Sequence, residues 1–277
     1  MLSHRHPWLY ALSVRFHRWR RRLSSLIDGR SYCNSCMPDV RLPNLIYQHR
    51  SLLLRSLEGV EGKLQRNKVV NLAIVCRRLD GVMIRPGETF SFCQLVGCPT
   101  QRRGFREGLE LSFGKPRSGI GGGICQSTNL IYWLALHSEL EVTERHHHTC
   151  DPFPDQGRVL PWSTGAAVFF NYRDLQLTNN SSRTYQIRIY LDETYLNCEL
   201  RVDVTPPLSY HISQQQHRFL LYDNDYYRAN EIWQRHVDRR TGNTIANVLI
   251  SKNIGRVLYE PTQEIQKSAV VISKKPA

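Results

Sequence analysis

The chain has 277 residues and a mass of 32.3 kDa, with 41% hydrophobic and 10% aromatic residues. This composition excludes general disorder, and the length suits one large domain or one domain with added arms. The net charge of +13 indicates an anionic neighbour, such as nucleic acid, an anionic lipid surface or an acidic polymer. Residues 1–30 hold seven arginines and one acidic residue, so much of the excess charge belongs to an N-terminal arm.

The cysteine content and the hydropathy indicate where in the cell the protein is expected. Eight cysteines in a chain of this size, without an export signal, favour a reducing compartment. Cys33 and Cys36 form the one CxxC pair, which is too few ligands for a structural zinc. No apolar run approaches the roughly 20 residues of a membrane-spanning helix. We therefore expect the protein in the cytoplasm, including the inner membrane face.

The arm has the pattern of an amphipathic helix. Arginines crowd its other faces, and its apolar residues recur every three or four positions at Leu9, Leu12, Phe16, Trp19, Leu23 and Leu26. A basic helix with tryptophan on its apolar side either lies in an anionic membrane surface or packs on its own protein. Peripheral contact of residues 8–27 with an anionic membrane is therefore one prediction, and packing on the body is the other.

Helical patterns dominate the next part of the chain, and strand patterns follow. After a polar connector at 29–43, helices are predicted at 44–60 and 66–80. Two short strands, 82–85 and 88–92, flank the turn pair Pro86-Gly87, and the glycines and prolines of residues 93–120 indicate loops.

The second half of the chain is rich in strand patterns. A breaker-free helical stretch starts near residue 125, and later strands are predicted at 141–150, 166–171, 174–178, 184–191 and 195–204, with a hairpin within 231–252. This order predicts an α+β fold, with N-terminal helices, a helix headed by Gly-Gly-Gly-Ile-Cys-Gln on an antiparallel sheet, and a strand-rich C-terminal half. We expect a basic arm and helical region at 1–64, a central domain at 65–205, and an extension at 206–277 packed on the same body.

A glycine-rich turn carries the first candidate site. Gly121, Gly122 and Gly123 precede Cys125 and Gln126 at the start of the predicted helix. Glycines let backbone N–H groups approach a ligand closely, and the positive end of a helix dipole lowers the pKa of a thiol. The motif predicts an activated cysteine beside anion-binding N–H groups, or else a small apolar thiol packed under a glycine turn.

The segment from Glu144 to Cys150 carries the second. On an extended strand Glu144, His146, His148 and Cys150 share one face, and Arg145 lies on the other. If this strand lies beside Cys125, an imidazole reaches the thiol and a carboxylate orients the imidazole, which is the general design of a thiol nucleophile.

Three interpretations of these residues stay open. In the first, Cys125 is the nucleophile, His146 or His148 the base and Glu144 the orienting group, with Gly121, Gly122, Gly123, Gln126, Arg145 and Glu88 binding substrate or anion. In the second, cysteines and histidines of both segments hold zinc. In the third, the same groups form a buried hydrogen-bond network in a non-catalytic binding protein. Our preferred prediction includes neither a metal nor a cofactor.

The nucleic-acid interpretation has little support. The chain has no helix-turn-helix, zinc-finger or RNA-recognition pattern, and its basic excess is largely confined to one arm. A P-loop would need Gly-Lys-Ser/Thr after the glycines, and that ending is absent.

Four motifs in order resemble the VanW family. They are Arg85-Pro86-Gly87-Glu88-Thr89-Phe90-Ser91-Phe92, the glycine-cysteine turn, Glu144-Arg145-His146 with His148, and Gly165-Ala166-Ala167-Val168 leading to Asp174-Leu175 and Asn179-Asn180. The resemblance covers about residues 65–200, and the overall layout resembles the short, non-exported members that accompany type B vancomycin resistance.

The resemblance implies a context rather than a reaction. The family is associated with glycopeptide resistance and the cell envelope, and its biochemical activity is not established. Combined with the candidate site, it suggests thiol chemistry on a peptidoglycan-related precursor, with a non-catalytic accessory binding protein as the alternative.

Overall fold

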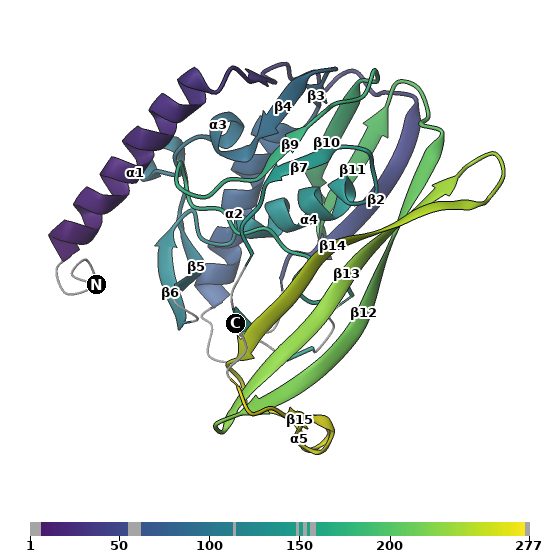
Figure 1. The fold of residues 1–277 in the computed structure, drawn as a ribbon. Coiled ribbons are helices and arrows are strands. Elements are labelled where there is room, and N and C mark those ends of the chain that lie inside the picture. Colours follow the sequence, from purple (N-terminus) through teal and green to yellow (C-terminus); the bar gives the residue numbers. More distant parts are fainter. Residues whose placement is uncertain are drawn as a thin grey trace.

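A computed structural model of the chain describes residues 7–54, 62–112, 115–147, 150–151, 154–155 and 159–274. Figure 1 shows a body of helices and sheets, with one helix along its outer side and three long strands at the opposite side. The helices are α1 (Pro7–Ile27), α2 (Gly62–Leu79), α3 (Phe92–Val96), α4 (Cys125–Ala135) and α5 (Gln263–Ser268). The α+β class predicted from the sequence is confirmed.

The strands within the described residues form four sheets. The first three sheets are β1-β4-β9-β7, β2-β11-β10-β3 and β15-β12-β13-β14-β8, and β5 pairs with β6 in a hairpin. The strands of the first half are β1 (Ser31–Tyr32), β2 (Asn44–Leu52), β3 (Val82–Ile84), β4 (Glu88–Ser91), β5 (Glu107–Ser112), β6 (Lys115–Ile120), β7 (Glu141–Glu144) and β8 (Cys150–Asp151). The later strands are β9 (Gln176–Thr178), β10 (Tyr185–Leu191), β11 (Tyr195–Val202), β12 (Leu208–Tyr222), β13 (Asp225–Asp238), β14 (Thr244–Val257) and β15 (Val270–Val271).

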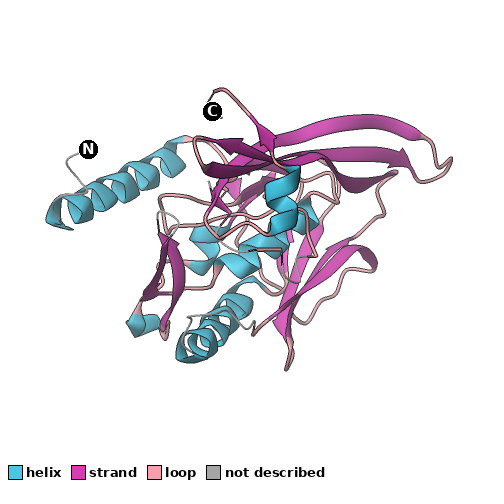
Figure 2. Ribbon diagram, turned by 90° about the horizontal axis from the view of Figure 1, so that it is seen from below, coloured by secondary structure: helices cyan, strands magenta, loops and turns pink. Residues whose placement is uncertain are grey.

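The main core lies where α2 and α4 pack on the sheet β2-β11-β10-β3. Helix α2 contacts β10, and α4 contacts β2 and β11. Figure 2 shows helices between the long strands and the remaining sheets. Apolar side chains occur around most of the circumference of α4. A helix of this kind is expected to be buried, and most of α4 is buried. The predicted helices at 66–80 and from residue 125 are confirmed by α2 and α4.

Four local predictions were wrong. The predicted helix at 44–60 begins as strand β2, because pairing with β11 overrides its helical pattern, and residues 55–61 lie outside the described residues. The predicted loop at 93–120 contains the hairpin β5–β6. The predicted strand at 141–150 divides between β7 and β8, which belong to different sheets. The predicted strand at 166–171 is irregular, with one isolated bridge from Phe169 to Arg173.

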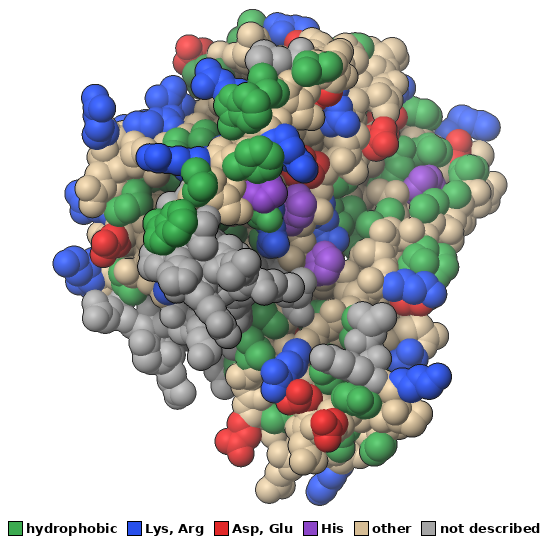
Figure 3. All heavy atoms as spheres, turned by 60° about the vertical axis from the view of Figure 1, so that its left-hand side comes forward, with side chains coloured by type: hydrophobic (Ala, Val, Ile, Leu, Met, Phe, Trp, Pro, Cys, Tyr) green, Lys and Arg blue, Asp and Glu red, His purple; other side chains and the backbone are tan. Residues whose placement is uncertain are grey.

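The arm forms α1, as the periodicity predicted, and its apolar row faces outward. Trp8, Phe16 and Trp19 are 65%, 55% and 61% exposed. Figure 3 shows hydrophobic side chains along this helix with basic ones beside them. No helix in the described ranges has both the length and the apolar character to cross a membrane.

The C-terminal strands β12, β13 and β14 contact the body through hydrogen bonds as well as apolar packing. Gln234 Nε2 donates to the carbonyl of Leu136 at 2.8 Å, and Asn230 Nδ2 donates to the carbonyl of Trp162 at 2.8 Å. Ile212 packs against the main core. These contacts join residues 206–274 to the central region, and the division at residues 64 and 205 stays a prediction.

A buried ion pair fastens β13 to β8. Arg228 Nη1 donates to Asp151 Oδ2 at 3.0 Å and to Asp155 Oδ1 at 2.6 Å. The side chains of Arg228 and Asp151 are 3% and 1% exposed. A guanidinium in this position compensates the desolvation of the Asp151 carboxylate.

We predict that Arg228→Ala lowers the free energy of unfolding by about 3–5 kcal/mol, because it leaves the Asp151 carboxylate buried without this cation. Arg235→Ala is the matched control, since Arg235 is exposed on the same strand and should change stability by less than about 0.5 kcal/mol. Urea denaturation of both variants measures the difference. Equal stability of the two variants would contradict the assignment.

Candidate functional site

The side chain of Glu144, at the end of β7, is the centre of the most connected polar cluster near the candidate residues. Its Oε1 accepts hydrogen bonds from Arg21 Nη1 at 2.9 Å, from the Asp174 N–H at 2.9 Å and from His146 Nε2 at 3.0 Å. Its Oε2 accepts from Arg21 Nη2. Burial opposes ionisation of Glu144, but the bonds from Arg21 and Asp174 outweigh it and lower the pKa of the carboxyl overall. Glu144 is therefore an ionised anchor for α1.

Asp174 forms the buried floor of this cluster. It accepts hydrogen bonds from Ser91 Oγ at 2.5 Å, from the Cys93 N–H at 2.8 Å and from the Leu175 N–H at 2.8 Å. Burial raises the pKa of Asp174 despite these bonds. Arg21 lies 3.9 Å from Asp174 Oδ2, so one guanidinium faces two carboxylates. The cluster ties α1 to the ends of β4, β7 and β9.

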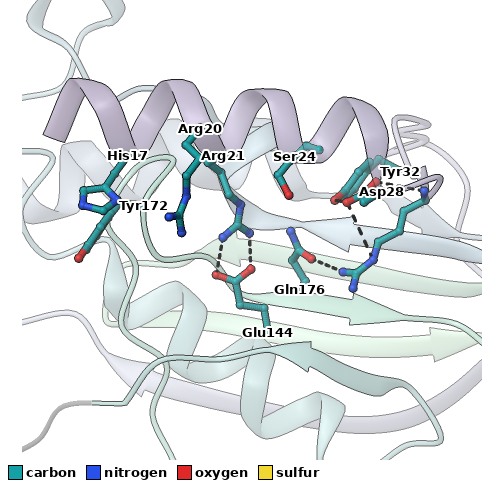
Figure 4. A pocket seen from close by; sticks show the side chains of 11 residues that line it. His17, Arg20, Arg21, Ser24, Asp28, Tyr32, Glu144, Tyr172 and Gln176 are labelled. Atoms are coloured by element: carbon teal, nitrogen blue, oxygen red, sulfur yellow. Dashed lines mark hydrogen bonds and ion pairs between the residues drawn. The ribbon is translucent and has the colours of Figure 1, made fainter. Parts of the chain in front are cut away.

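A pocket of about 330 Å³ lies under α1, beside the Arg21–Glu144 pair (Figure 4). Its lining consists of His17, Arg20, Arg21, Ser24, Ser25, Asp28, Arg30, Tyr32, Glu144, Tyr172 and Gln176. Most of these residues lie on α1 or just after it. The lining is polar and carries three guanidinium groups against two carboxylates.

The guanidinium groups of the pocket differ in their partners. Arg21 is bound to Glu144, and Arg30 Nη1 donates to Gln176 Oε1 at 2.7 Å. Figure 4 shows Arg20 pointing from α1 toward the same space, and within the described part of the chain its guanidinium has no hydrogen bond or ion pair. Arg20 is therefore the cation of this pocket that is available to an anion.

Cys125 lies at the start of α4, as predicted, but its surroundings do not activate it. Its thiol faces the carbonyl of Val168 at 3.9 Å. Burial raises the pKa of the Cys125 thiol, and the nearby Glu110 carboxylate raises it further. Desolvation of the thiolate thus opposes the lowering of the pKa that the sequence predicted for a thiol at a helix N-terminus.

Cys125 and His146 have different partners. His146 bonds to Glu144, and its carbonyl accepts the Ala167 N–H at 2.7 Å. The next residue, Val168, offers its carbonyl to Cys125. The segment 166–168 thus runs between the thiol and the histidine segment, and among the described residues no hydrogen bond joins Cys125 to an imidazole.

Two of the three N–H groups in the glycine turn have backbone partners. The N–H of Gly121 donates to the carbonyl of Arg106 at 3.0 Å, and that of Gly122 donates to the carbonyl of Gly119 at 3.0 Å. A Cβ on Gly122 would lie 2.2 Å from the backbone of Gly108. A Cβ on Gly123, whose φ is +90°, would lie 2.2 Å from the side chain of Lys68. The glycines therefore serve close packing against β5 and α2.

Gln126 and Glu88 make structural contacts. The side-chain amide of Gln126 donates to Ser51 Oγ and to the carbonyl of Leu52, both at 2.9 Å, at the end of β2. The backbone N–H of Gln126 donates to the carbonyl of Gly123 at 3.1 Å. Glu88 accepts the N–H of Arg85 at 2.8 Å within the turn before β4. These bonds give both side chains partners within the fold, and their assignment to ligand binding stays a prediction.

Arg145 supports the backbone of the next segment. Its Nε donates to the carbonyl of Gly165 at 2.9 Å, an Nη donates to the carbonyl of Ser163, and the guanidinium lies 4.4 Å from the ring centre of Tyr132. Burial lowers the pKa of Arg145. Arg145 also lines a second pocket of about 590 Å³, between α4, β7 and β12–β14.

The zinc interpretation can be examined only for the described residues. His148 lies outside the described residues. Cys150 pairs with Arg256 in the C-terminal sheet, whereas Glu144 belongs to the sheet of β9. In the ranges that the structure describes, no three histidine, cysteine or acidic side chains are placed to hold a metal ion.

The sequence missed the contribution of α1. Arg20, Arg21 and Arg30 belong to the basic arm. The sequence pattern indicated that its charges lie on a face exposed to solvent. Arg21 and Glu144 are 123 residues apart, so no local pattern connects them. The one available indication was that Arg18 and Arg21 fall opposite the apolar row of the helix.

We predict that iodoacetamide modifies Cys125 more slowly than N-acetylcysteine at neutral pH. Because burial raises the pKa of the thiol, the thiolate fraction is depressed, and the rate should rise only at a more alkaline pH than it does for N-acetylcysteine. Mass spectrometry of the peptide that carries Cys125 measures this rate. Rapid modification at pH 7, with an inflection below that of N-acetylcysteine, would contradict the raised pKa of this half-buried thiol.

Comparisons with known proteins place these residues in a family. A family model described as VanW like protein matches residues 67–201. The vancomycin B-type resistance protein VanW of Enterococcus faecalis is 29% identical over 232 residues, which is 84% of this chain and 84% of that protein.

A second similar protein is the uncharacterized protein YoaR of Bacillus subtilis. It is 31% identical over 100 residues, which cover 36% of this chain and 33% of that protein. No solved structure matches the chain. The family model and the extended similarity to the enterococcal protein agree with the order of the four motifs, and the chain belongs to the VanW family.

Proposed function

We propose that this chain is a non-catalytic accessory protein of glycopeptide resistance that binds an anionic group of a peptidoglycan-related precursor in the pocket under α1. The observation that carries the proposal is the guanidinium of Arg20, which lines that pocket and has no partner among the described residues. The process is inferred from the name of the enterococcal relative, a vancomycin B-type resistance protein.

The chemistry of the pocket suits a carboxylate or a phosphate. A guanidinium presents a planar set of N–H donors that matches two oxygens of such a group. The hydroxyl of Tyr32, already bonded to Asp28 at 2.7 Å, and the side chain of Ser24 add polar groups to the same lining. Peptidoglycan precursors carry carboxylates, so they belong to the class of ligand that this lining favours.

Binding has more support than thiol catalysis. A thiol enzyme on Cys125 needs an accessible thiolate with a base beside it. Burial raises the pKa of Cys125, and the thiol faces the Val168 carbonyl. Glu144 contacts His146 as that hypothesis requires, but it also accepts hydrogen bonds from Arg21 and from the Asp174 N–H, and within the described residues no hydrogen bond links His146 to Cys125. The same side chains are thus better explained as supports of the fold and of the pocket.

We predict that the purified full chain binds a soluble muramyl pentapeptide with a free terminal carboxylate more tightly than its C-terminal amide. Arg20→Ala should weaken this binding about tenfold or more, since a hydrogen bond to a charged group contributes about 1.5–3 kcal/mol. Arg20→Lys should restore part of the affinity because it keeps the charge without the planar fork. Isothermal titration calorimetry measures the dissociation constants.

Arg22→Ala is the matched control for the binding experiment. Arg22 lies on the same helix, is exposed and does not line the pocket. An equal loss of affinity in Arg20→Ala and Arg22→Ala would mean that net charge, and not the pocket, attracts the peptide. Unchanged affinity in Arg20→Ala would overturn the assignment of the pocket.

A further inference from the structure

The outward side of α1 carries a continuous apolar row. Its side chains recur every three or four residues and are 38% to 81% exposed, at Trp8, Leu12, Phe16, Trp19, Leu23 and Ile27. The hydrophobic core of the described residues includes none of them. A row of this length on one helix exceeds the scattered surface apolar residues that are normal for proteins.

The docking of α1 explains why the row faces outward. Arg18 Nε donates to the carbonyl of Phe170 at 3.2 Å, and Asn171 Nδ2 donates to the carbonyl of Arg18 at 2.7 Å. The ring of His17 contacts that of Tyr172, with centroids 5.0 Å apart. Together with the Arg21–Glu144 pair, these contacts attach the polar face of the helix to the body. An ordinary surface helix would be docked the other way round, with its apolar face inward.

Basic residues border the row. Arg15 and Arg22 are exposed and, within the described residues, have no hydrogen bond or ion pair. No acidic residue occurs between Pro7 and Ile27. An exposed apolar stripe with tryptophans and a border of arginines is the composition of helices that lie in the plane of an anionic bilayer surface.

We propose that α1 attaches the protein to an anionic phospholipid surface, with its axis parallel to the membrane and its apolar row inserted among the headgroups. Trp8 and Trp19 take the interfacial positions that tryptophan favours. Arg15 and Arg22 face the lipid phosphates, and the body lies on the side of the helix that faces away from the lipid. The 21 residues give about 31 Å of contact along the surface.

A second copy of the chain fits this face less well. Two copies packed through their apolar rows would bring Arg15 and Arg22 of one copy against the same residues of the other, and neither copy supplies an acid on this helix. Like charges across an interface disfavour association. Anionic lipids supply the complementary charge, which is why the membrane is the preferred occupant.

Co-sedimentation of the full chain with vesicles tests this proposal. Vesicles that contain phosphatidylglycerol should bind the protein, and pure phosphatidylcholine vesicles should bind it much less. Phe16→Ser combined with Trp19→Ser should lower the partition coefficient about tenfold or more. Arg15→Ala combined with Arg22→Ala should lower it by about fivefold for each arginine on anionic vesicles only.

The matched control is Ile245→Ser combined with Val248→Ser, which removes two exposed apolar side chains from β14. This variant should bind vesicles as the unaltered chain does. Circular dichroism confirms that all variants fold, which is expected because the altered side chains are exposed. Arg20 is unchanged in every variant, so failure here leaves the pocket proposal standing.

Three results would overturn the membrane proposal. The first is equal vesicle binding by the α1 variant and the β14 variant. The second is no binding of the full chain to anionic vesicles. The third is a concentration-dependent dimer in light scattering that Phe16→Ser with Trp19→Ser abolishes, because the apolar row would then bind a second copy.

Discussion

The contact between Arg21 and Glu144 decides how the N-terminal helix sits on the protein. The apolar row of α1 faces outward, so burial of that row cannot hold the helix on the body. Its attachment depends on polar contacts, among which the paired hydrogen bonds from Arg21 to Glu144 engage both carboxylate oxygens. Isolated surface ion pairs contribute little, but both side chains are largely shielded here, at 23% and 17% exposed, and Asp174 adds a further bond to Glu144.

The attachment of α1 through its polar face has two consequences, on opposite sides of the helix. On the inner side it creates a polar pocket whose walls come from the helix and from the sheet of β4, β7 and β9. On the outer side it presents the apolar row with its basic border. The family match at residues 67–201 includes Glu144 and Asp174 but not α1, so the partner carboxylates belong to the family domain and the arginines belong to the arm.

The sequence predicted those parts of the fold that depend on local patterns. The helical periodicity of α2 and α4 and the alternation in β10 and β11 are contained within single elements. Strand β2 was taken for a helix because its pairing partner lies about 150 residues later, at β11. The thiol site failed for a similar reason: the strand expected through His146 ends at Glu144, and the segment 166–168 comes between Cys125 and His146. The sequence correctly predicted that this turn needs glycines for its backbone. The structure shows that a side chain is excluded there because the backbone of Gly108 approaches closely.

Hydrogen exchange of the α1 amides measures whether the Arg21–Glu144 contact holds the helix on the body. Glu144→Gln removes the charge that Arg21 contacts, and Glu141→Gln on the same strand is the matched control, since Glu141 contacts Asn180 instead. Residues 17–27 should exchange markedly faster in Glu144→Gln and at an unchanged rate in Glu141→Gln, while α4 keeps its protection in both variants. Equal protection of α1 in the unaltered chain and in Glu144→Gln would contradict the account.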